Sequence, residues 1–426
     1  MLKKLLFLLF PVFINAQGYT SYFTGNTTNI TTNPEFGVCL MGGASENDEA
    51  MKWLLQKANG GDVVVLRSSG SNGYNNYLYS ELGISVNSVE TLVITSVAGA
   101  INPYVLDKVA NAEMIWFAGG DQWNYVSFFK DNALEDLLNH HINVKNAPIG
   151  GTSAGMAILG GKYFNAQNGS VTSAQAMNNP YHPNVMLGYD DFLTVPFFED
   201  VITDTHYDNP DRRGRQSTFI ARLKNDFNFD VKGVAANEYV AICIDVNGKA
   251  RVFGDFPAYQ EFAFFVQVNC SNPNPIENIQ IGQPLTWNFN GQALKVYKVP
   301  GTMNGNNFFD LSNWENGLNS GGTWEHWSVN NGVFASVPGT PIDCSLTANN
   351  FEISNFQVVP NPFLTNFSVN GITSAQISLF DMQGRLVFQK QITNQEIIET
   401  NLLQSGIYTI QIQEENKIQT KKIIKN

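Results

Sequence analysis

The sequence of 426 residues has little charge and few cysteines. Charged residues make up 15% of the chain, and its four cysteines form no Cys-x-x-Cys pair, so a zinc or thiol-redox motif is not supported. Basic residues are also scarce. The chain has 25 Lys and Arg against 37 Asp and Glu, a formal net charge of −12. An acidic chain is repelled by phosphate backbones, which argues against nucleic acid as a partner.

Apolar runs long enough to cross a bilayer, about 20 residues, are also missing. The run at 5–14 is too short, but Lys3 and Lys4 precede it and Ala16 follows it. Basic residues, a short apolar core and a small residue form a secretory signal peptide. We therefore expect residues 1–16 to be cleaved and the protein to be secreted, with an N-terminal anchor as the alternative.

The cysteines fall into two kinds of surroundings. Cys39 and Cys243 lie in apolar, strand-like runs and are expected to be buried thiols. Cys270 and Cys344 lie in Asn- and Pro-rich segments. Export permits disulfides, and we expect these two to form a bridge, although four cysteines allow three pairings.

Within the domain expected at residues 17–268, strand-like and helix-like segments alternate from Phe36 to about Val268. Short apolar runs predict strands at 36–41, 62–66, 91–95, 114–118 and 147–150, and amphipathic stretches predict helices at 47–58, 103–110 and 126–138. This alternation indicates a three-layer α/β domain with a mostly parallel sheet and helices on both faces. Ligands bind such sheets at the carboxyl ends of the strands.

The composition changes near residue 269. Residues 269–350 begin with a Pro- and Asn-rich linker and continue with Trp, Gly and Asn, which predicts a small β-rich middle module. Its Trp314, Trp324 and Trp327 are more typical of a β core than of the alternative, a sugar-binding platform.

Residues 351–426 alternate as short strands with glycine turns, which predicts a small antiparallel β-sandwich. The segment resembles the C-terminal sorting domain of the type IX secretion system. It has the Pro-Asn-Pro opening at 360–362, the Asp-x-x-Gly-Arg-Leu-Val turn at 381–387, the Ser-Gly-Ile-Tyr strand at 405–408 and a Lys-rich end. The resemblance implies export by that machinery to the outside or the surface of the cell.

A serine follows the strand at 147–150, in the sequence Gly-Thr-Ser-Ala-Gly at 151–155. Small residues around a serine at a strand-to-helix turn are typical of a nucleophile elbow, so Ser153 is the candidate nucleophile. The Ala154 N–H then begins a helix and is one candidate oxyanion donor. Gly120, after the strand at 114–118, offers the second.

A serine nucleophile needs a base, and the chain has five histidines. His140 and His141 end a predicted helix, where they favour the helix dipole. His182 falls in a Pro-rich loop and His326 outside the catalytic region. His206 follows a short apolar run and precedes the basic cluster at 211–215, so it is the candidate base.

Taken together, these motifs resemble the cyanophycinase/dipeptidase E family of serine peptidases. The matching elements are Gly-Gly at 42–43, Phe-Ala-Gly-Gly-Asp-Gln at 117–122, the elbow, Asp-x-His-Tyr at 204–207, Arg-Gly-Arg at 213–215 and Gly-Val-Ala-Ala-Asn-Glu at 233–238. The resemblance implies a class I glutamine amidotransferase-like α/β fold, with Ser153 as nucleophile and His206 as base. It also implies a substrate pocket lined by four side chains: Gln122, Asp204, Arg213 and Arg215.

The chain departs from the family pattern in two respects. The first concerns the pocket: Thr205 stands where the family has Gln, and Thr218 stands where a third pocket arginine is expected. The second concerns the acid that orients the histidine, which the family draws from the segment after the serine, whereas no Asp or Glu lies between Ser153 and Asp190. The candidates for the third triad member are Gln167, Asn168 and Glu238, and the sequence does not choose among them.

The function expected from these features is hydrolysis of cyanophycin to β-Asp-Arg dipeptides by a secreted serine exopeptidase. The alternatives are an aspartyl or isoaspartyl dipeptidase and a catalytically degenerate polymer-binding protein. An amidotransferase-like activity would require cysteine at the elbow. No cofactor or metal is implied. The expected partners are a peptide or cyanophycin-like polymer and the type IX machinery, and a homodimer is left open.

Overall fold

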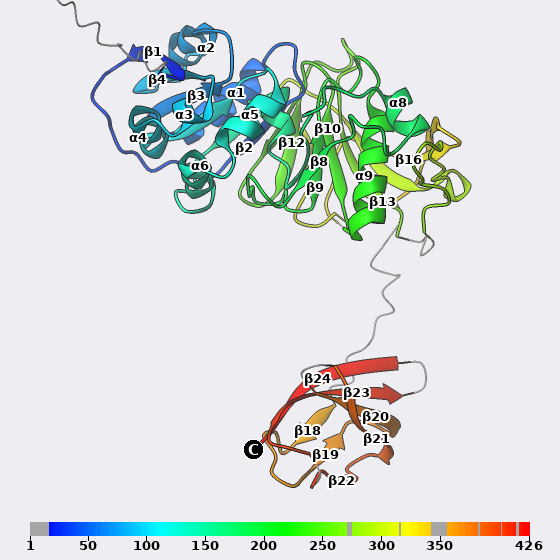
Figure 1. Ribbon diagram of the computed structural model, residues 1–426. Helices are drawn as coiled ribbons and strands as arrows, with labels where there is room; N and C mark the ends of the chain where they lie inside the picture. The colour runs from blue at the N-terminus through cyan, green and yellow to red at the C-terminus, as the bar shows by residue number, and fades with distance from the viewer. Residues whose placement is uncertain are drawn as a thin grey trace, which may run out of the picture. The chain divides into compact units, whose positions relative to one another are not determined.

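The computed structural model describes residues 17–270, 275–314, 317–341, 356–381, 384–401, 403–414 and 417–426 (Figure 1). The chain forms two compact units, Met1–Cys344 and Ser345–Asn426. The expected signal peptide, residues 1–16, lies outside the described residues. Among the residues described, no helix has both the length and the apolar character needed to span a bilayer.

A nine-stranded sheet forms one half of the first unit. Its strands, in spatial order, are β1 (Tyr19–Gly25), β4 (Ser88–Ile94), β3 (Asp62–Arg67), β5 (Met114–Phe117), β6 (Ile149–Thr152), β2 (Val38–Met41), β11 (Ala241–Ile244), β12 (Lys249–Phe253) and β15 (Asn307–Asp310). The run from β4 to β2 is parallel, and the strands outside it pair antiparallel. The carboxyl ends of β3, β5, β6 and β2 therefore meet at one edge.

The helices of this half follow the predicted pattern with one difference. They are α1 (Asp48–Lys57), α2 (Gly73–Asn76) with the π-helical turn η1 (Tyr77–Glu81), α3 (Val97–Ala100), α4 (Pro103–Asn111), α5 (Gln122–Phe129) and α6 (Ala133–Asn143). The single helix expected at 126–138 is two helices. Asp131 adopts φ 59°, and the Asn132 side chain caps α6 by accepting the Leu134 N–H, so the chain turns there.

The second half of the unit is an eight-stranded sheet. Its order is β17 (Val333–Pro338), β16 (Thr323–Asn330), β14 (Leu294–Pro300), β13 (Phe262–Val268), β10 (Lys232–Ala236), β9 (Val201–Asp204), β7 (Lys162–Phe164) and β8 (Leu187–Tyr189). Only the β10–β9 and β9–β7 pairs are parallel within the described strands of this sheet. The remaining elements are α7 (Ala154–Ala157), α8 (Ser173–Asn178), α9 (Arg213–Phe227) and the 3₁₀ turn η2 (Phe289–Gly291).

The first unit is thus built on two mixed sheets, rather than on the one mostly parallel sheet that the alternation predicted. The middle module expected at 269–350 is also not a separate body. Strand β14 pairs with β13, and β15 pairs with β12, so this segment extends both sheets of the first unit. Its composition differs because it supplies antiparallel edge strands, whose backbone bonds are made with strands from the earlier sequence.

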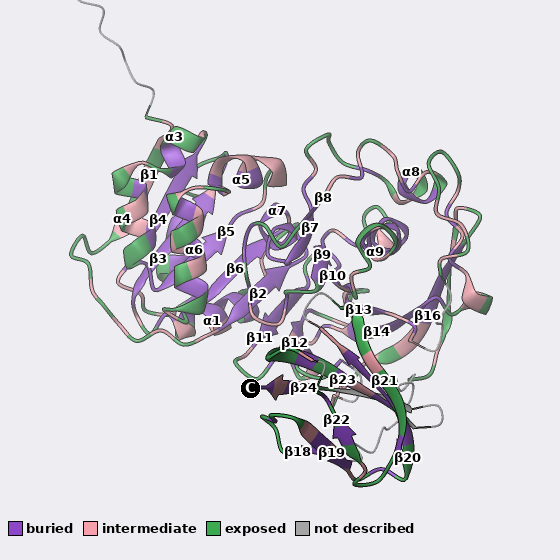
Figure 2. Cartoon of the chain, turned by 60° about the horizontal axis from the view of Figure 1, so that its bottom comes forward, coloured by how far each residue is buried: buried purple, intermediate pink, exposed green. Residues whose placement is uncertain are grey.

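The core of the first unit lies on these sheets, whose strands are mostly buried (Figure 2). Trp314 and Trp327 are buried in two different hydrophobic clusters, and Trp324 packs partly buried against the first. They therefore form core, as favoured above, and not one exposed platform. Cys39 and Cys243 are buried free thiols. Cys270 is disulfide-bonded, and Cys344 lies outside the described residues.

The second unit is a small all-β body. A three-stranded antiparallel sheet contains β18 (Gln357–Val359), β19 (Asn366–Asn370) and β22 (Ile397–Glu399), and a four-stranded one contains β21 (Leu386–Thr393), β20 (Ser374–Phe380), β23 (Gly406–Glu414) and β24 (Lys417–Lys425). Alternate residues such as Phe367, Ile377 and Ile410 are buried in its own core. This agrees with the sandwich predicted for 351–426. The predicted turn residues 382–383 lie outside the described residues.

Candidate active site

Ser153 occupies a sharp turn between β6 and α7. Its φ and ψ are 53° and −115°, a conformation that a non-glycine residue adopts only when its surroundings enforce it. The Ser153 N–H donates to Met41 O on the neighbouring strand at 3.0 Å. The turn is therefore fixed to the sheet, and the serine lies at the edge where the parallel strands end, as the elbow motif predicted.

The glycines on either side of the serine are required by close packing. A Cβ at Gly151 would lie 2.5 Å from the Gly155 carbonyl carbon, and one at Gly155 would lie 2.2 Å from Phe117 O. Any larger side chain would therefore push α7 away from β5. The strand-to-helix turn can form only because both positions lack a side chain.

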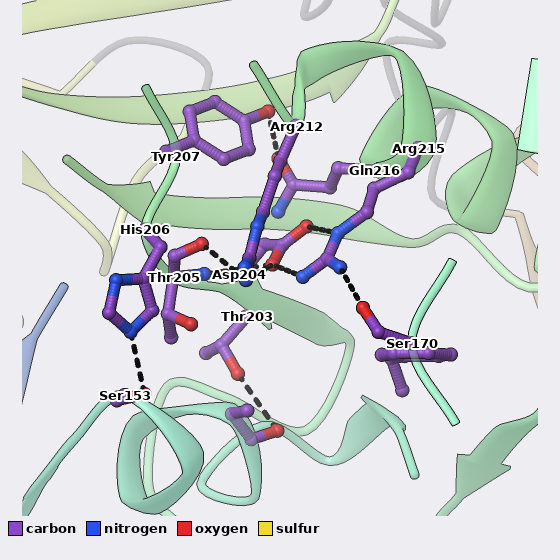
Figure 3. A network of polar contacts seen from close by, with 12 residues as sticks. Ser153, Ser170, Thr203, Asp204, Thr205, His206, Tyr207, Arg212, Arg215 and Gln216 are labelled. Atoms are coloured by element: carbon purple, nitrogen blue, oxygen red, sulfur yellow. Dashed lines mark hydrogen bonds and ion pairs between the residues drawn. The ribbon is translucent and has the colours of Figure 1, made fainter. Parts of the chain in front are cut away.

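His206 lies directly after β9, on the second sheet, and reaches the serine from there. Its Nε2 is 2.7 Å from Ser153 Oγ. The backbone N–H of His206 donates to Gly42 O at 2.7 Å, and a Cβ at Gly43 would lie 2.3 Å from the imidazole Cε1. The Gly-Gly turn after β2 therefore makes room for the ring, which points toward Ser153 in Figure 3.

Glu238 is the acid that meets the histidine. Its Oε1 lies 2.6 Å from His206 Nδ1, and its Oε2 accepts a hydrogen bond from Asn209 Nδ2 at 3.3 Å. These hydrogen bonds, that of His206 first, hold the pKa of the Glu238 carboxyl below its usual range. The carboxylate therefore stays ionised at neutral pH and can hold the imidazole in the tautomer with a proton on Nδ1.

The other two candidates for the third member lie elsewhere. Asn168 is exposed and donates from Nδ2 to Pro183 O at 2.8 Å, and the Gln167 N–H donates to Asn165 Oδ1 at 2.9 Å. Neither bond involves His206. The sequence could not choose Glu238 because its distance from His206 along the chain, 32 residues, is bridged only when β10 pairs with β9.

The glycine turn after β5 lies against the serine. A Cβ at Gly119 would be 4.0 Å from Ser153 Oγ, and Gly120 has φ 153°. Ala154 begins α7 directly after the serine. Gly120 and Ala154 thus belong to the two backbone segments next to the serine, and their N–H groups remain the candidate oxyanion donors.

Asp204 and Arg215, both predicted to line the substrate pocket, are instead paired with each other in the interior (Figure 3). Arg215 Nε and Nη2 donate to the two oxygens of Asp204, with 2.8 Å and 2.5 Å between the atoms, and both residues are buried. Arg215 Nη1 also donates to Val171 O at 3.2 Å. A bidentate pair that is already complete fastens α9 and the 165–172 loop to β9 and leaves little of either side chain for a ligand.

Two neighbouring arginines are closer to solvent. Arg213 donates from Nε and Nη2 to Asp211, at 2.9 Å and 2.6 Å, and is half-buried. Arg212 was not among the residues predicted for the site. It donates from Nη1 to Thr205 O, next to His206, at 3.0 Å. Burial, and then the positive charge of Arg215, lower the pKa of Arg212 to about 10. Its place within the basic cluster 211–215 was the signal that pointed to it.

Gln122 and His141 were also singled out by the sequence. Gln122 is the first residue of α5, and its Nε2 donates to Phe164 O. His141 ends α6 as expected but is buried, and burial lowers its pKa to about 4, so it is neutral and does not act as a cation on the helix dipole. No group of three or more His, Cys, Asp or Glu residues that could hold a metal occurs in the part of the chain described.

Comparison with known proteins agrees with this geometry. Residues 73–250, which include Ser153, His206 and Glu238, match the profile "Peptidase family S51". This match spans less than half of the chain, and it indicates a serine-type peptidase. Residues 357–426 match "Secretion system C-terminal sorting domain", which indicates type IX secretion and an extracellular or cell-surface location.

The relatives found by comparison are distant. Curated cyanophycinases of Synechococcus elongatus and Thermosynechococcus vestitus are each 25% identical over 258 residues, which span 57% of this chain and 75% of the relative. The crystal structure of a peptidase from an acI-B1 Actinobacterium is 15% identical, with a TM-score of 0.39, over 54% of this chain and 94% of that one.

Proposed function

We propose that the protein is an exported serine exopeptidase that hydrolyses cyanophycin to β-Asp-Arg dipeptides through an acyl-Ser153 intermediate. The observation that carries the proposal is the continuous chain of short contacts from Ser153 Oγ to His206 Nε2, 2.7 Å, and from His206 Nδ1 to Glu238 Oε1, 2.6 Å. A nucleophile, a base and an orienting acid at these distances form the arrangement that acyl transfer uses.

The proposed reaction has two stages. His206 Nε2 accepts the Ser153 proton as Oγ attacks the scissile carbonyl carbon, and the N–H groups of Gly120 and Ala154 stabilise the oxyanion. The imidazolium, stabilised by Glu238, then gives its proton to the leaving amine. Water enters, loses a proton to His206 and attacks the ester carbonyl, which releases the acid product and restores the Ser153 hydroxyl.

The substrate is the less constrained part of the proposal. The S51 match and the cyanophycinase relatives support an aspartyl peptide as substrate. The mutual pairing of Asp204 and Arg215 removes two of the groups expected to contact it, which keeps hydrolysis of other aspartyl or isoaspartyl peptides as the second candidate. A degenerate binding protein is the third alternative, and labelling of Ser153 by a serine-directed fluorophosphonate would count against it.

The deciding experiment measures dipeptide release from purified cyanophycin by mass spectrometry, with the mature enzyme and with Ser153→Ala. We expect β-Asp-Arg from the enzyme and none from the variant. Release of short Asp-X or β-Asp-X peptides alone would move the substrate to the second candidate. Equal release by both proteins would exclude Ser153 as the nucleophile.

A further inference from the structure

Two buried cysteines face each other across the β2–β11 pair of strands. The register of the pair sets Cys39 opposite Cys243, and their Sγ atoms are 3.5 Å apart. Both residues are fully buried, on strands that lie side by side in the nine-stranded sheet (Figure 2). Sulfur atoms at this distance are in van der Waals contact, and they need to approach by only about 1.5 Å to reach the length of a disulfide bond.

The hydrogen bonds of β2 show which kind of strand pair the cysteines form. The carbonyl groups of Gly37 and Met41 accept bonds from the β6 side, and the Gly42 N–H donates to the segment that enters β11. Successive residues of a strand direct their backbone groups to opposite neighbours, so residue 39, like 37 and 41, bonds toward β6. Cys39 and Cys243 are therefore a non-hydrogen-bonded pair, in which opposite Cα atoms are about 4.5 Å apart and the side chains come closest. That separation lies within the range of disulfides.

The protein reaches surroundings in which cysteines become oxidised. Its sorting domain indicates an extracellular or cell-surface location, and Cys270 of the same unit is disulfide-bonded. Exported proteins form and keep disulfides because the compartments that they enter are oxidising. Cys39 and Cys243 are thus two contacting thiols in a chain that already carries a disulfide.

The end of β2 holds the backbone of each segment that carries a candidate catalytic residue. The carbonyl groups of residues 41, 42 and 43 accept the N–H groups of Ser153, His206 and Tyr239, at 3.0 Å, 2.7 Å and 3.0 Å respectively. Tyr239 directly follows Glu238. Whatever fixes this end of β2 relative to β11 therefore also fixes the backbone at the serine, the histidine and the acid.

We propose that Cys39 and Cys243 are joined by a disulfide in the exported protein, and that this bond fixes the end of β2 to β11 beneath the candidate site. The two residues are 204 positions apart, so the bond closes a loop that contains all three candidate catalytic residues. A cross-link that closes a long loop restricts the unfolded chain strongly and stabilises the folded one. The inference does not depend on the proposed hydrolysis of cyanophycin.

The bond forms by exchange with an oxidant that itself carries a disulfide, either an oxidised dithiol protein or a small-molecule disulfide. The thiolate of one cysteine attacks a sulfur of the oxidant and displaces one thiolate from it. The thiolate of the other cysteine then attacks this mixed disulfide, which forms the Cys39–Cys243 bond and displaces the second thiolate of the oxidant. The two cysteines thereby lose two protons and two electrons, and the disulfide of the oxidant is reduced to two thiols.

Burial determines when this exchange takes place. Burial, and then the hydrogen bond to Cys39, raise the pKa of the Cys243 thiol, and neither residue is exposed in the folded protein. The thiolate is the attacking species, and a buried thiol with a raised pKa supplies little of it. The bond is therefore expected to form while the chain folds, before β2 and β11 are covered, and to resist reductants once the protein is native.

The first test maps the disulfides of the exported full chain. Protein in which Cys270 is protected by its own disulfide is denatured without reductant in the presence of iodoacetamide and then digested. Mass spectrometry is expected to find one peptide pair that links Cys39 to Cys243, lighter by two hydrogens than the separate peptides, and no alkylation at either residue. Alkylation of both residues, or a link from either one to a different cysteine, would overturn the proposal.

A second test measures what the bond contributes to stability. Cys39→Ala and Cys243→Ala each remove the whole bond, so each should lower the melting temperature of the first unit by about 5 °C. The double variant should lose little more than either single variant. In chains folded in a reductant the bond is absent, and the two single losses should then add, because they reflect packing alone. Additive losses without reductant would contradict the bond.

Hydrogen exchange measures the effect of the bond on the candidate site without any substrate. The amides of Ser153, His206 and Tyr239 donate to the carbonyl groups at 41–43, and we expect them to exchange about tenfold faster in the double variant than in the unchanged chain. Cys270→Ala is the matched control, because it removes a different disulfide, and it should leave the exchange of these three amides unchanged. Equal exchange rates in the double variant and the unchanged chain would overturn the proposed effect on the site.

Discussion

Two side-chain pairs come from the same short stretch of sequence and differ in their exposure to solvent. His206 pairs with Glu238 at 2.6 Å, and the two side chains are 24% and 19% exposed. Asp204, two residues earlier, pairs with Arg215, and those side chains are 4% and 5% exposed. Both pairs are short and well aligned. Only the first remains open to solvent on one side, where a substrate can reach it.

The difference shows that the residues of one motif, Asp-x-His-Tyr at 204–207, need not share one role. Alternation along a strand would place residues 204 and 206 on the same face, but β9 ends at Asp204 and His206 has φ 46°, so the chain turns there and His206 lies on the rim. The buried pair, Asp204 and Arg215, fixes α9 against β9. His206 of the rim pair lies two residues beyond the end of β9. We expect changes at the rim to alter rate and changes in the interior to alter stability.

The largest effect is expected at the serine itself. Ser153→Ala removes the nucleophile and should reduce kcat by at least about 10⁴-fold, because the remaining groups only position the substrate. The rate of dipeptide release measures activity, and the denaturant midpoint of unfolding measures stability. The midpoint should stay the same or rise, because alanine has no hydroxyl that requires a hydrogen-bond partner. A residual rate within tenfold of the unchanged enzyme would contradict the assignment.

The rim acid comes next. Glu238→Gln should lower kcat by about 10³- to 10⁴-fold, because an amide favours the wrong imidazole tautomer and does not stabilise the imidazolium. Asn168→Ala is the matched control, since Asn168 was an alternative third member but lies away from His206, and its kcat should not change. If Asn168→Ala were the damaging variant instead, the assignment of the acid would be wrong.

The interior pair should respond in stability instead. Arg215→Met leaves the Asp204 carboxylate buried without its partner and should cost about 3–5 kcal/mol of unfolding free energy. Arg213→Met, at the half-exposed pair with Asp211, should cost less than about 1 kcal/mol. Urea unfolding curves of both variants measure this. Comparable losses for the two variants would mean that burial does not separate the pairs.

A smaller effect concerns pH. Burial lowers the pKa of His141 to about 4 in the folded protein, against about 6.5 when unfolded. A lowered folded pKa gives a contribution that is complete above pH 6.5 and is lost as the pH falls toward 4. At pH 5 the loss is about 2 kcal/mol. His141→Gln should flatten this dependence between pH 7 and pH 5, and an unchanged slope would show that other groups cause it.

Much of the site could be predicted because its signals are local. The elbow at 151–155 requires small residues within one turn, and Asn47 before α1 is a cap whose bond spans three residues. Local patterns of this kind depend on neighbours in sequence, so they can be read without the fold. Reliance on local hydrophobic periodicity also explains why one helix was predicted where α5 and α6 are separate. The positive φ of Asp131, which ends the first helix, is not encoded by that periodicity.

The sequence by itself determined the elbow turn, the choice of Ser153 and His206 as candidates, the α/β character of the first unit and the separate β-rich tail. Tertiary structure alone decided three further points: that Glu238 meets His206, that Asp204 and Arg215 satisfy each other in the interior, and that β14 and β15 join the catalytic sheets. The physical reason is common to all three. Each depends on strand pairing between segments far apart in the chain, and the register of that pairing sets which side chains meet and which are shielded from water.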